Sequence, residues 1–377
     1  MISRLFIKNK FFISLLTIPL ILSLIGIVFI FESSAVRSMH EFGDSFHYLK
    51  LQMIWMGLGM ICLTIFSLFD YHKLYYFAFL AMMATIMLLV IVLIPNIGSK
   101  AGGSRRWLDL GFFNVQPTEI AKFSVIIYLS SWFIHKERKR FFSFLILLGI
   151  LMALIMLQPD MGTAIIVFSI SIIMYFLSGM NFMHLLLLVP AAVGGFALLI
   201  KISPYRFNRL LAFFDPSRDP LGITYHINQI LISLSNGGLF GQGIGASRQK
   251  YLFLPEAHTD SIFAIIAEEI GFIGCVVIIG LFIFLIYKMY QVAKFAPDRY
   301  GKLLAGGIFA FFNLQIVINL AGITNLFPLT GVPLPFISYG GSNLLICFAM
   351  LGILMNIEKQ MRKIEFSKLQ SVKRKRR

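Results

Sequence analysis

The hydrophobic residues of this chain gather into long runs that are separated by shorter polar stretches. Ten runs are each close to the ~20 apolar residues that a helix needs to cross a bilayer. They cover residues 12–31, 49–69, 75–95, 117–134, 142–158, 162–178, 183–201, 261–287, 303–322 and 338–357. A membrane β-barrel shows short alternating segments instead. The pattern therefore predicts an all-α, polytopic membrane protein with about ten transmembrane helices.

Composition agrees with a membrane protein. The 377 residues are 58% hydrophobic and 13% charged, whereas about 25% of the residues of a soluble domain are charged. The first apolar run is too long for the core of a signal peptide, so we expect it to be an uncleaved span. We predict a single membrane domain, 1–377, with one long hydrophilic segment at 202–260 and a basic tail at 358–377.

The positive charge is distributed unevenly between the two sides of the predicted membrane. With the N-terminus inside, 21 Lys and Arg residues fall on the cytoplasmic side and 11 fall outside. This positive-inside bias predicts that both termini are cytoplasmic and that 202–260 is extracytoplasmic. The net charge of +16 is therefore interpreted as a topology signal rather than a sign of nucleic-acid binding. The tail either contacts anionic membrane lipid or docks a cytoplasmic partner.

The stretch LPEAHTD, 254–260, places three proton-transfer groups directly before the eighth apolar run. In one interpretation Thr259 or Asp260 simply caps the following helix. In the other, Asp260 is a general base, because a carboxylate beside lipid has a raised pKa that suits proton abstraction. His258 is either a loop residue or a proton shuttle. Since no ATP is available outside the cell, any chemistry here needs an already activated substrate.

Two further acidic positions lie at the predicted outer ends of spans. Glu119 and Lys122 are spaced i, i+3 at the start of the fourth run, so they share a helix face. They form either a structural intramembrane ion pair or a polar cavity for a substrate head group. Asp160 lies in the stretch QPDMG, whose residue types are also those of a tight turn. We expect all three acids, including Asp260, near the outer leaflet.

Cationic and glycine-rich stretches complete the candidate chemistry. Arg105 and Arg106 beside a tryptophan belong to an interfacial belt or grip a phosphate, and Arg248 and Lys250 offer a second cationic cluster. The stretch GGLFGQGIGAS, 237–247, is a flexible hinge or a backbone nest for an anion.

Two observations narrow the architecture and the chemistry further. The prolines and glycines of 329–343 forbid regular helix, which predicts irregular backbone that is buried or walls a cavity. Motifs for a P-loop, HExxH, CxxC or GxSxG do not occur in the sequence. ATP-driven transport and zinc or serine hydrolysis therefore lack support.

Six segments resemble, in the same order, the motifs of the SEDS family (shape, elongation, division and sporulation) of bacterial cell-wall polymerases. They are GSRRWLDLGFFNVQPTEIAK, LQPDMGTA, FDPSRDPLG, NGGLFGQGIGAS, LPEAHTDSIFAIIAEEIG and PLPFISYGGSN. The resemblance covers nearly the whole chain. FGDSFHYLK in the first outer loop, together with PEAHTD, is more similar to the division branch, FtsW, than to the elongation branch, RodA. The chain departs from the family at Ser261 and at Ser342 and Asn343, which leaves Asp260 intact.

The resemblance implies a peptidoglycan glycosyltransferase that polymerises lipid II at the outer face of the plasma membrane. Asp260 falls on the family's essential acid, the aspartate of its HTD motif. Arg105, Arg248 and Lys250, or a divalent cation such as Mg²⁺ or Mn²⁺, would neutralise the departing undecaprenyl diphosphate. A single displacement would invert the donor sugar.

The resemblance also implies partners, and it leaves competing functions open. A class B penicillin-binding protein, which is a transpeptidase, and other divisome proteins are the implied partners. The competing interpretations are a lipid II flippase, an elongation-type polymerase and a scaffold. The acidic and Gly/Pro-rich signals gather at the predicted outer face, which favours the polymerase.

Overall fold

The computed structural model describes residues 2–375 except 96, 102–103, 110, 112–113, 135–139, 180–181 and 252. Ten long helices correspond one to one to the ten predicted runs, so the all-α membrane fold is confirmed. They are α1 (Ile2–Phe42), α2 (His47–Leu68), α3 (Leu74–Ile91), α4 (Pro117–Trp132), α5 (Phe141–Leu157), α6 (Met161–Leu177), α7 (Phe182–Ile202), α10 (Ile262–Phe295), α11 (Arg299–Ile323) and α12 (Gly341–Lys375). The basic loop at 135–140, assigned to the cytoplasm from the sequence, lies almost entirely outside the described residues.

Not every described helix is long and apolar enough to cross a bilayer by itself. Six of them are, namely α1, α2, α3, α10, α11 and α12. A seventh span arises if α7 and α8 (Pro204–Phe214), which are bent by 103° at their junction, form one broken span. Pro204 explains the break, because its ring has no N–H to continue α7 and suits the first turn of a new helix. The count of ten spans stays a prediction.

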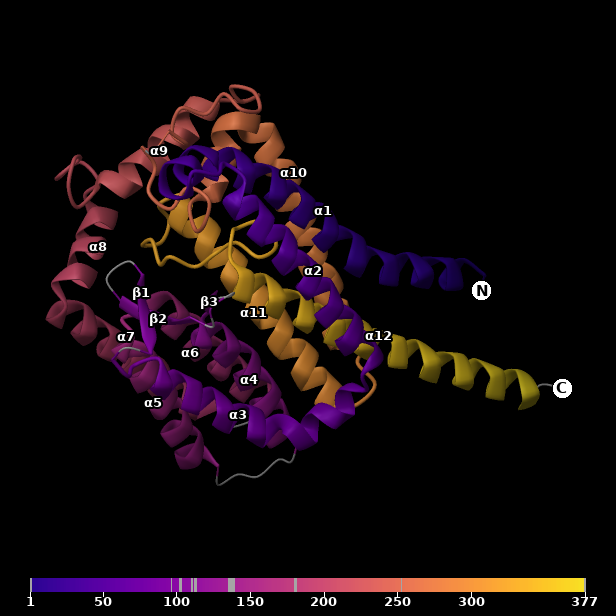
Figure 1. The fold of residues 1–377 in the computed structure, drawn as a ribbon. Helices are drawn as coiled ribbons and strands as arrows, with labels where there is room; N and C mark the ends of the chain where they lie inside the picture. The colour runs from indigo at the N-terminus through magenta and orange to yellow at the C-terminus, as the bar shows by residue number, and fades with distance from the viewer. Residues whose placement is uncertain are drawn as a thin grey trace.

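The most deeply buried of the long apolar helices are α11 and α12. Helix α12 packs along α2, and α10 packs against α11 and α9 (Tyr225–Gly237) (Figure 1). The buried ring of Phe336 stacks on Phe312 and meets Phe348, with centroids 5.5 and 5.4 Å apart. Phe336 belongs to the stretch before α12 that the prolines and glycines predicted to be irregular. The prediction for 329–343 is confirmed up to Gly340, because 328–334 has no helix and Leu334 and Phe336 are buried. It is wrong for the last three residues, since α12 begins at Gly341.

The glycine-rich stretch 237–247 docks on a break in α10. Gly271 interrupts the helix with a φ of 68°, a left-handed conformation that glycine adopts at low cost. The exposed backbone groups there are satisfied by the loop, since Phe272 N donates to Gly238 O and Gln242 N donates to Glu268 O, at 2.9 and 3.0 Å. The loop therefore supplies hydrogen-bond partners to the backbone of α10 where the helix is interrupted.

A small antiparallel sheet lies beside α4. It consists of β1 (Gly98–Ala101), β2 (Ser104–Asp109) and β3 (Asn114–Val115), in that order. Strand β2 carries Arg105 and Arg106 on neighbouring positions. Because successive side chains of a strand point to opposite faces, only one of the two arginines is directed toward a given side of the sheet.

Candidate active site

A large apolar cavity of about 500 Å³ lies between α6, α7, α8 and the stretch after α11. Its apolar wall comes mainly from α6 and α7, and its charged lining residues are Arg106, Asp160, Arg206 and Arg209. Three guanidinium groups against one carboxylate give this lining a net positive charge. An apolar cavity with a cationic rim suits a ligand in which a hydrocarbon chain is joined to an anionic head group.

A second cavity of about 260 Å³ adjoins the first. It is lined by Asn208, Arg209, Ala212, Phe213, Ile223, His226, Ile227, Asp260, Asn325 and Leu329. Arg209 and Leu329 line both cavities, so the two spaces meet at these residues. The smaller cavity is below the roughly 300–1,000 Å³ of pockets that enclose whole drug-sized ligands, and its lining is rich in groups that bond to hydroxyls.

Asp260 is half-buried in the turn that leads into α10. Its backbone oxygen accepts a hydrogen bond from Asn319 Nδ2 at 2.9 Å, and its Oδ1 lies 3.3 Å from Thr259 Oγ1. Burial raises the pKa of the Asp260 carboxyl, although the positive charge of Arg209 partly opposes this rise. A carboxylate that binds a proton more readily than usual is suited to general-base catalysis.

The helix-cap interpretation of this turn is wrong. The N-cap of α10 is Ser261, and it makes no side-chain capping hydrogen bond. The hydroxyl of Thr259 instead donates to Glu256 Oε2 at 2.9 Å. Helix initiation therefore does not explain why an acid stands at position 260.

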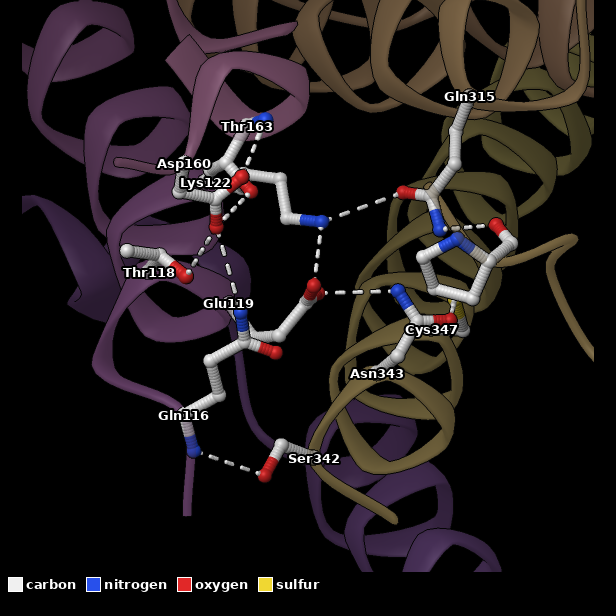
Figure 2. A network of polar contacts seen from close by, with 11 residues as sticks. Gln116, Thr118, Glu119, Lys122, Asp160, Thr163, Gln315, Ser342, Asn343 and Cys347 are labelled. Carbon is white, nitrogen blue, oxygen red and sulfur yellow. Dashed lines mark hydrogen bonds and ion pairs between the residues drawn. The ribbon is translucent and has the colours of Figure 1, made fainter. Parts of the chain in front are cut away.

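Glu119 and Lys122 form the expected ion pair, and Figure 2 shows how it is enclosed. Lys122 Nζ lies 2.7 Å from Glu119 Oε1, and both side chains are buried. Asn343 Nδ2 donates to Glu119 Oε2 at 2.9 Å, while Gln315 Oε1 lies 3.5 Å from Lys122 Nζ. Neither residue lines the two cavities. The geometry supports the structural interpretation of the pair, and its role in substrate binding stays a prediction.

Asp160 lies beside this network and also lines the large cavity. Its carboxylate caps α6 by accepting from Thr163 N at 3.1 Å, and it accepts a second bond from Thr163 Oγ1 at 2.9 Å. Gln116 Nε2 and Thr118 Oγ1 approach the oxygen Oδ2 that Thr163 Oγ1 also contacts, at 3.3 and 3.5 Å (Figure 2). The turn thus holds Asp160 in place at the cationic rim.

The predicted cations are separated by the fold. Arg106 enters the large cavity and donates to the backbone oxygens of Gln158 and Pro159, at 3.0 and 2.5 Å. Arg105 is half-buried on the neighbouring position and Arg248 is exposed. Neither of these two lines a described cavity, so their contact with a leaving group stays a prediction.

Lys250 belongs to a separate buried cluster. Its ammonium lies 2.8 Å from Glu32 Oε2 on α1 and 3.4 Å from Glu269 Oε1 on α10. The carboxylate of Glu269 also accepts from Gly245 N and Ser247 N, at 3.0 and 3.3 Å. The sequence left a flexible hinge and a backbone nest open for the glycine-rich loop, and in the structure its N–H groups bind the chain's own Glu269.

His258 is buried between two tyrosines rather than in either cavity. Its ring centroid lies 4.6 Å from that of Tyr48 and 5.5 Å from that of Tyr339. Burial lowers the pKa of His258 to about 4, so the ring is neutral near pH 7. Among the described residues its Nδ1 has no hydrogen-bond partner.

Three functional candidates were missed in the sequence, namely Arg206, Arg209 and His226. The two arginines are spaced i, i+3 on α8 and therefore share a face. Arg209 Nη1 donates to Leu329 O at 3.2 Å and Arg206 Nη2 to Met156 O at 3.4 Å. The spacing in RFNRLL was a usable signal, but no local pattern indicated that Asp260 would lie next to it.

The sequence left open whether the protein binds a divalent cation. Among the described residues there is no group of three His, Cys, Asp or Glu side chains that could hold a metal ion. Arg106, Arg206 and Arg209 are the cations that line the large cavity, and a metal requirement stays a prediction.

Known proteins with the same sequence pattern and fold give the family. Residues 13–363 match the family model of the cell cycle proteins FtsW, RodA and SpoVE. The chain is 39% identical over 355 residues to stage V sporulation protein E of Bacillus subtilis (strain 168), which covers 92% of this chain and 97% of that protein. It is 37% identical over 353 residues to the probable peptidoglycan glycosyltransferase FtsW of Geobacter sp. (strain M18), which covers 92% and 96%.

The fold is similar to that of solved members of this group. A chain of a peptidoglycan synthase complex that coordinates polymerization and crosslinking superposes with a TM-score of 0.76 at 28% identity, over 92% of this chain and 97% of that one. The rod shape determining protein RodA of Thermus thermophilus superposes with a TM-score of 0.68 at 26% identity, over 92% and 96%. The chain therefore belongs to the FtsW/RodA/SpoVE family of cell cycle proteins.

Proposed function

We propose that this chain is a peptidoglycan glycosyltransferase of the division branch, which polymerises lipid II at the outer face of the plasma membrane. Relatives with 34–39% identity over most of their length carry the name probable peptidoglycan glycosyltransferase FtsW. The observation that carries the proposal is the meeting of two cavities at Arg209, one with a cationic rim and one that contains Asp260.

The large cavity suits the donor substrate. Its apolar wall can hold the first part of a polyprenyl chain, while Arg106, Arg206 and Arg209 face the position of a diphosphate. Guanidinium groups match phosphate oxygens with two parallel hydrogen bonds and stay charged at any physiological pH. They stabilise the negative charge that grows on the diphosphate as it leaves.

The small cavity suits the acceptor sugar. Asn208 and Asn325 offer hydrogen bonds to hydroxyl groups around Asp260. In the reaction, the 4-hydroxyl oxygen of the acceptor GlcNAc attacks the anomeric carbon of the donor MurNAc, and the bond from that carbon to the diphosphate oxygen breaks. The diphosphate leaves with the electron pair, and Asp260 takes the hydroxyl proton. One displacement without a covalent intermediate converts the α-linked donor into a β-linked product.

Orientation and partnership belong to the same proposal. The free ends of α1 and α12 project from the same side of the bundle (Figure 1), which supports two cytoplasmic termini, and the basic tail of α12 then faces anionic lipid.

The sequence has no SxxK and KTG pair for acyl transfer, so we infer a class B penicillin-binding protein and other divisome proteins as partners. Gly274 on α10 is partly exposed and would permit close approach of a partner helix, whereas Gly306 on α11 is buried against Leu177 of α6.

The experiment is polymerisation by the purified protein. Wild-type protein in detergent is incubated with fluorescent lipid II, alone and with its cognate class B enzyme, and products are separated by size before and after muramidase digestion. Long muramidase-sensitive strands are expected, with a higher rate in the complex. Lipid II movement across vesicle membranes without any strand synthesis would instead make the chain a flippase and would contradict the proposal.

A further inference from the structure

We propose that His226 is a positioning residue for Asp260, holding the turn that carries this acid from the wall of the acceptor cavity. The inference rests on the proposed function and adds a residue that neither the sequence motifs nor the comparisons assign. His226 is on the first turn of α9, more than thirty positions before Asp260, so only the fold brings the two side chains to the same cavity.

His226 is bonded to the end of the turn that carries Asp260. Its Nε2 lies 2.8 Å from the hydroxyl oxygen of Ser261, the residue that follows Asp260. The bond joins α9 to the residue directly after the acid, so the ring limits how far this end of the turn can move.

The remaining tethers of this turn come from the helix bundle. Asn319 Nδ2 on α11 donates to the backbone oxygen of Asp260 at 2.9 Å. The backbone N–H of Tyr339, before α12, donates to the backbone oxygen of His258 at 2.9 Å. His226 is the tether from α9, so it fixes the acid relative to the cavity wall that the acceptor contacts.

The ring is neutral near pH 7. Burial, followed by the charge of Arg209, lowers the pKa of His226 to about 4, while Glu256 opposes the shift. A neutral imidazole has one N–H donor and one acceptor nitrogen, and a hydroxyl both donates and accepts, so Nε2 can bond to Ser261 in either tautomer. An imidazolium would place a second cation beside Arg209 in this cavity, which also contains the carboxylate of Asp260.

Loss of the tether should act on turnover rather than on substrate capture. Without the imidazole the hydroxyl of Ser261 has no fixed partner, and the neighbouring carboxylate is free to shift. A misplacement of about 1 Å in a reacting group can cost roughly 10²-fold in rate. The donor cavity does not contain His226, so the KM for lipid II should change little.

The test compares substitutions at both ends of the bond in the lipid II polymerisation assay. His226→Phe fills the same space without nitrogens and should lower kcat by ~10–100-fold with KM within about threefold. His226→Gln keeps an amide that can replace the bond to Ser261 and should recover kcat to within about threefold. Ser261→Ala should also lower kcat, and the double variant His226→Phe with Ser261→Ala should be no slower than the slower single variant.

Controls separate this inference from the proposed function. Exposed His40 receives the same change, His40→Phe, and should behave like the wild type, while Asp260→Asn gives the background without catalysis. Should His226→Phe fail to fold, as judged by gel filtration and Tm, Ser261→Ala and His226→Gln still decide the matter. Wild-type kcat in both Ser261→Ala and a folded His226→Phe, or fully multiplicative losses in the double variant, would overturn the positioning role even though the wild type polymerises lipid II. A wild type without polymerase activity would contradict the proposed function instead.

Discussion

Arg209 and Asp260 line the same 260 Å³ cavity, and the guanidinium limits the rise in pKa that burial causes in the Asp260 carboxyl. One residue belongs to α8 and the other to the turn before α10, so the pair exists only in the folded bundle. Arg209 also lines the large cavity. This position lets one cation act on the base and on the leaving group at the same time.

Replacing Arg209 with glutamine should therefore impair both functions. Loss of a charge-stabilising donor at a leaving group typically costs ~10²–10³ in kcat, and we expect Arg209→Gln to lose at least ~10-fold. Without the cation the pKa of Asp260 should rise further, which moves the acid limb of the pH–rate profile to higher pH. Exposed Arg218 gives the matched control Arg218→Gln. Equal turnover and equal pH profiles for the two variants would contradict the shared role of Arg209.

Asp260 should cost the protein stability at neutral pH. Its folded pKa is raised, so the folded state disfavours the ionised form relative to the unfolded chain, and stability falls as pH rises through the folded pKa. A neutral asparagine removes this cost. We expect Asp260→Asn to raise the Tm at pH 7, and the difference from wild type should shrink as the pH falls toward the ordinary value near 4. A lower Tm for Asp260→Asn at pH 7 would show that the carboxylate is stabilising.

The Glu119–Lys122 pair should behave as a buried structural unit. Removing one member of such a pair costs roughly 3–5 kcal/mol, because the other charge is left without compensation. Lys122→Ala and Glu119→Ala should each lower the Tm strongly, and the double variant should lose less than the sum of the two. Thermal unfolding followed by gel filtration measures all three. Additive losses of stability would mean that the 2.7 Å contact contributes nothing as a pair.

Lys250 has two possible roles, which a pair of variants can distinguish. It is either the structural cation between two carboxylates or, as the sequence indicated, a group that binds the leaving group. Lys250→Met leaves Glu32 and Glu269 without their shared cation, so we expect a drop in Tm of at least ~5 °C. Adding Glu269→Gln should restore part of the Tm and the turnover together. If the double variant regains stability but stays inactive, Lys250 acts on the substrate and the structural account of this residue is wrong.

The sequence predicted the parts of this protein that depend on local pattern. Each apolar run matched one helix because burial in lipid requires a continuous apolar segment, and the Glu119–Lys122 contact followed from helical spacing. Asp260 was found because its neighbours form a recognisable motif. Long-range contacts were not predictable in the same way. Nothing in the linear pattern showed that Lys250 would meet Glu32 on α1, or that Arg209 and His226 would face Asp260, because these contacts are set by how α8 and α9 fold back on the bundle.

The central claim is that Asp260 takes the proton of the acceptor hydroxyl in a lipid II polymerase. The most direct measurement is the rate of glycan-strand synthesis by purified, folded Asp260→Asn protein with labelled lipid II, alongside wild type at equal concentration. Asparagine keeps the shape of the side chain and cannot act as a base, so the account predicts a loss of at least ~10²-fold, with Tm unchanged or raised. A folded Asp260→Asn protein that polymerises lipid II within tenfold of the wild-type rate would contradict it.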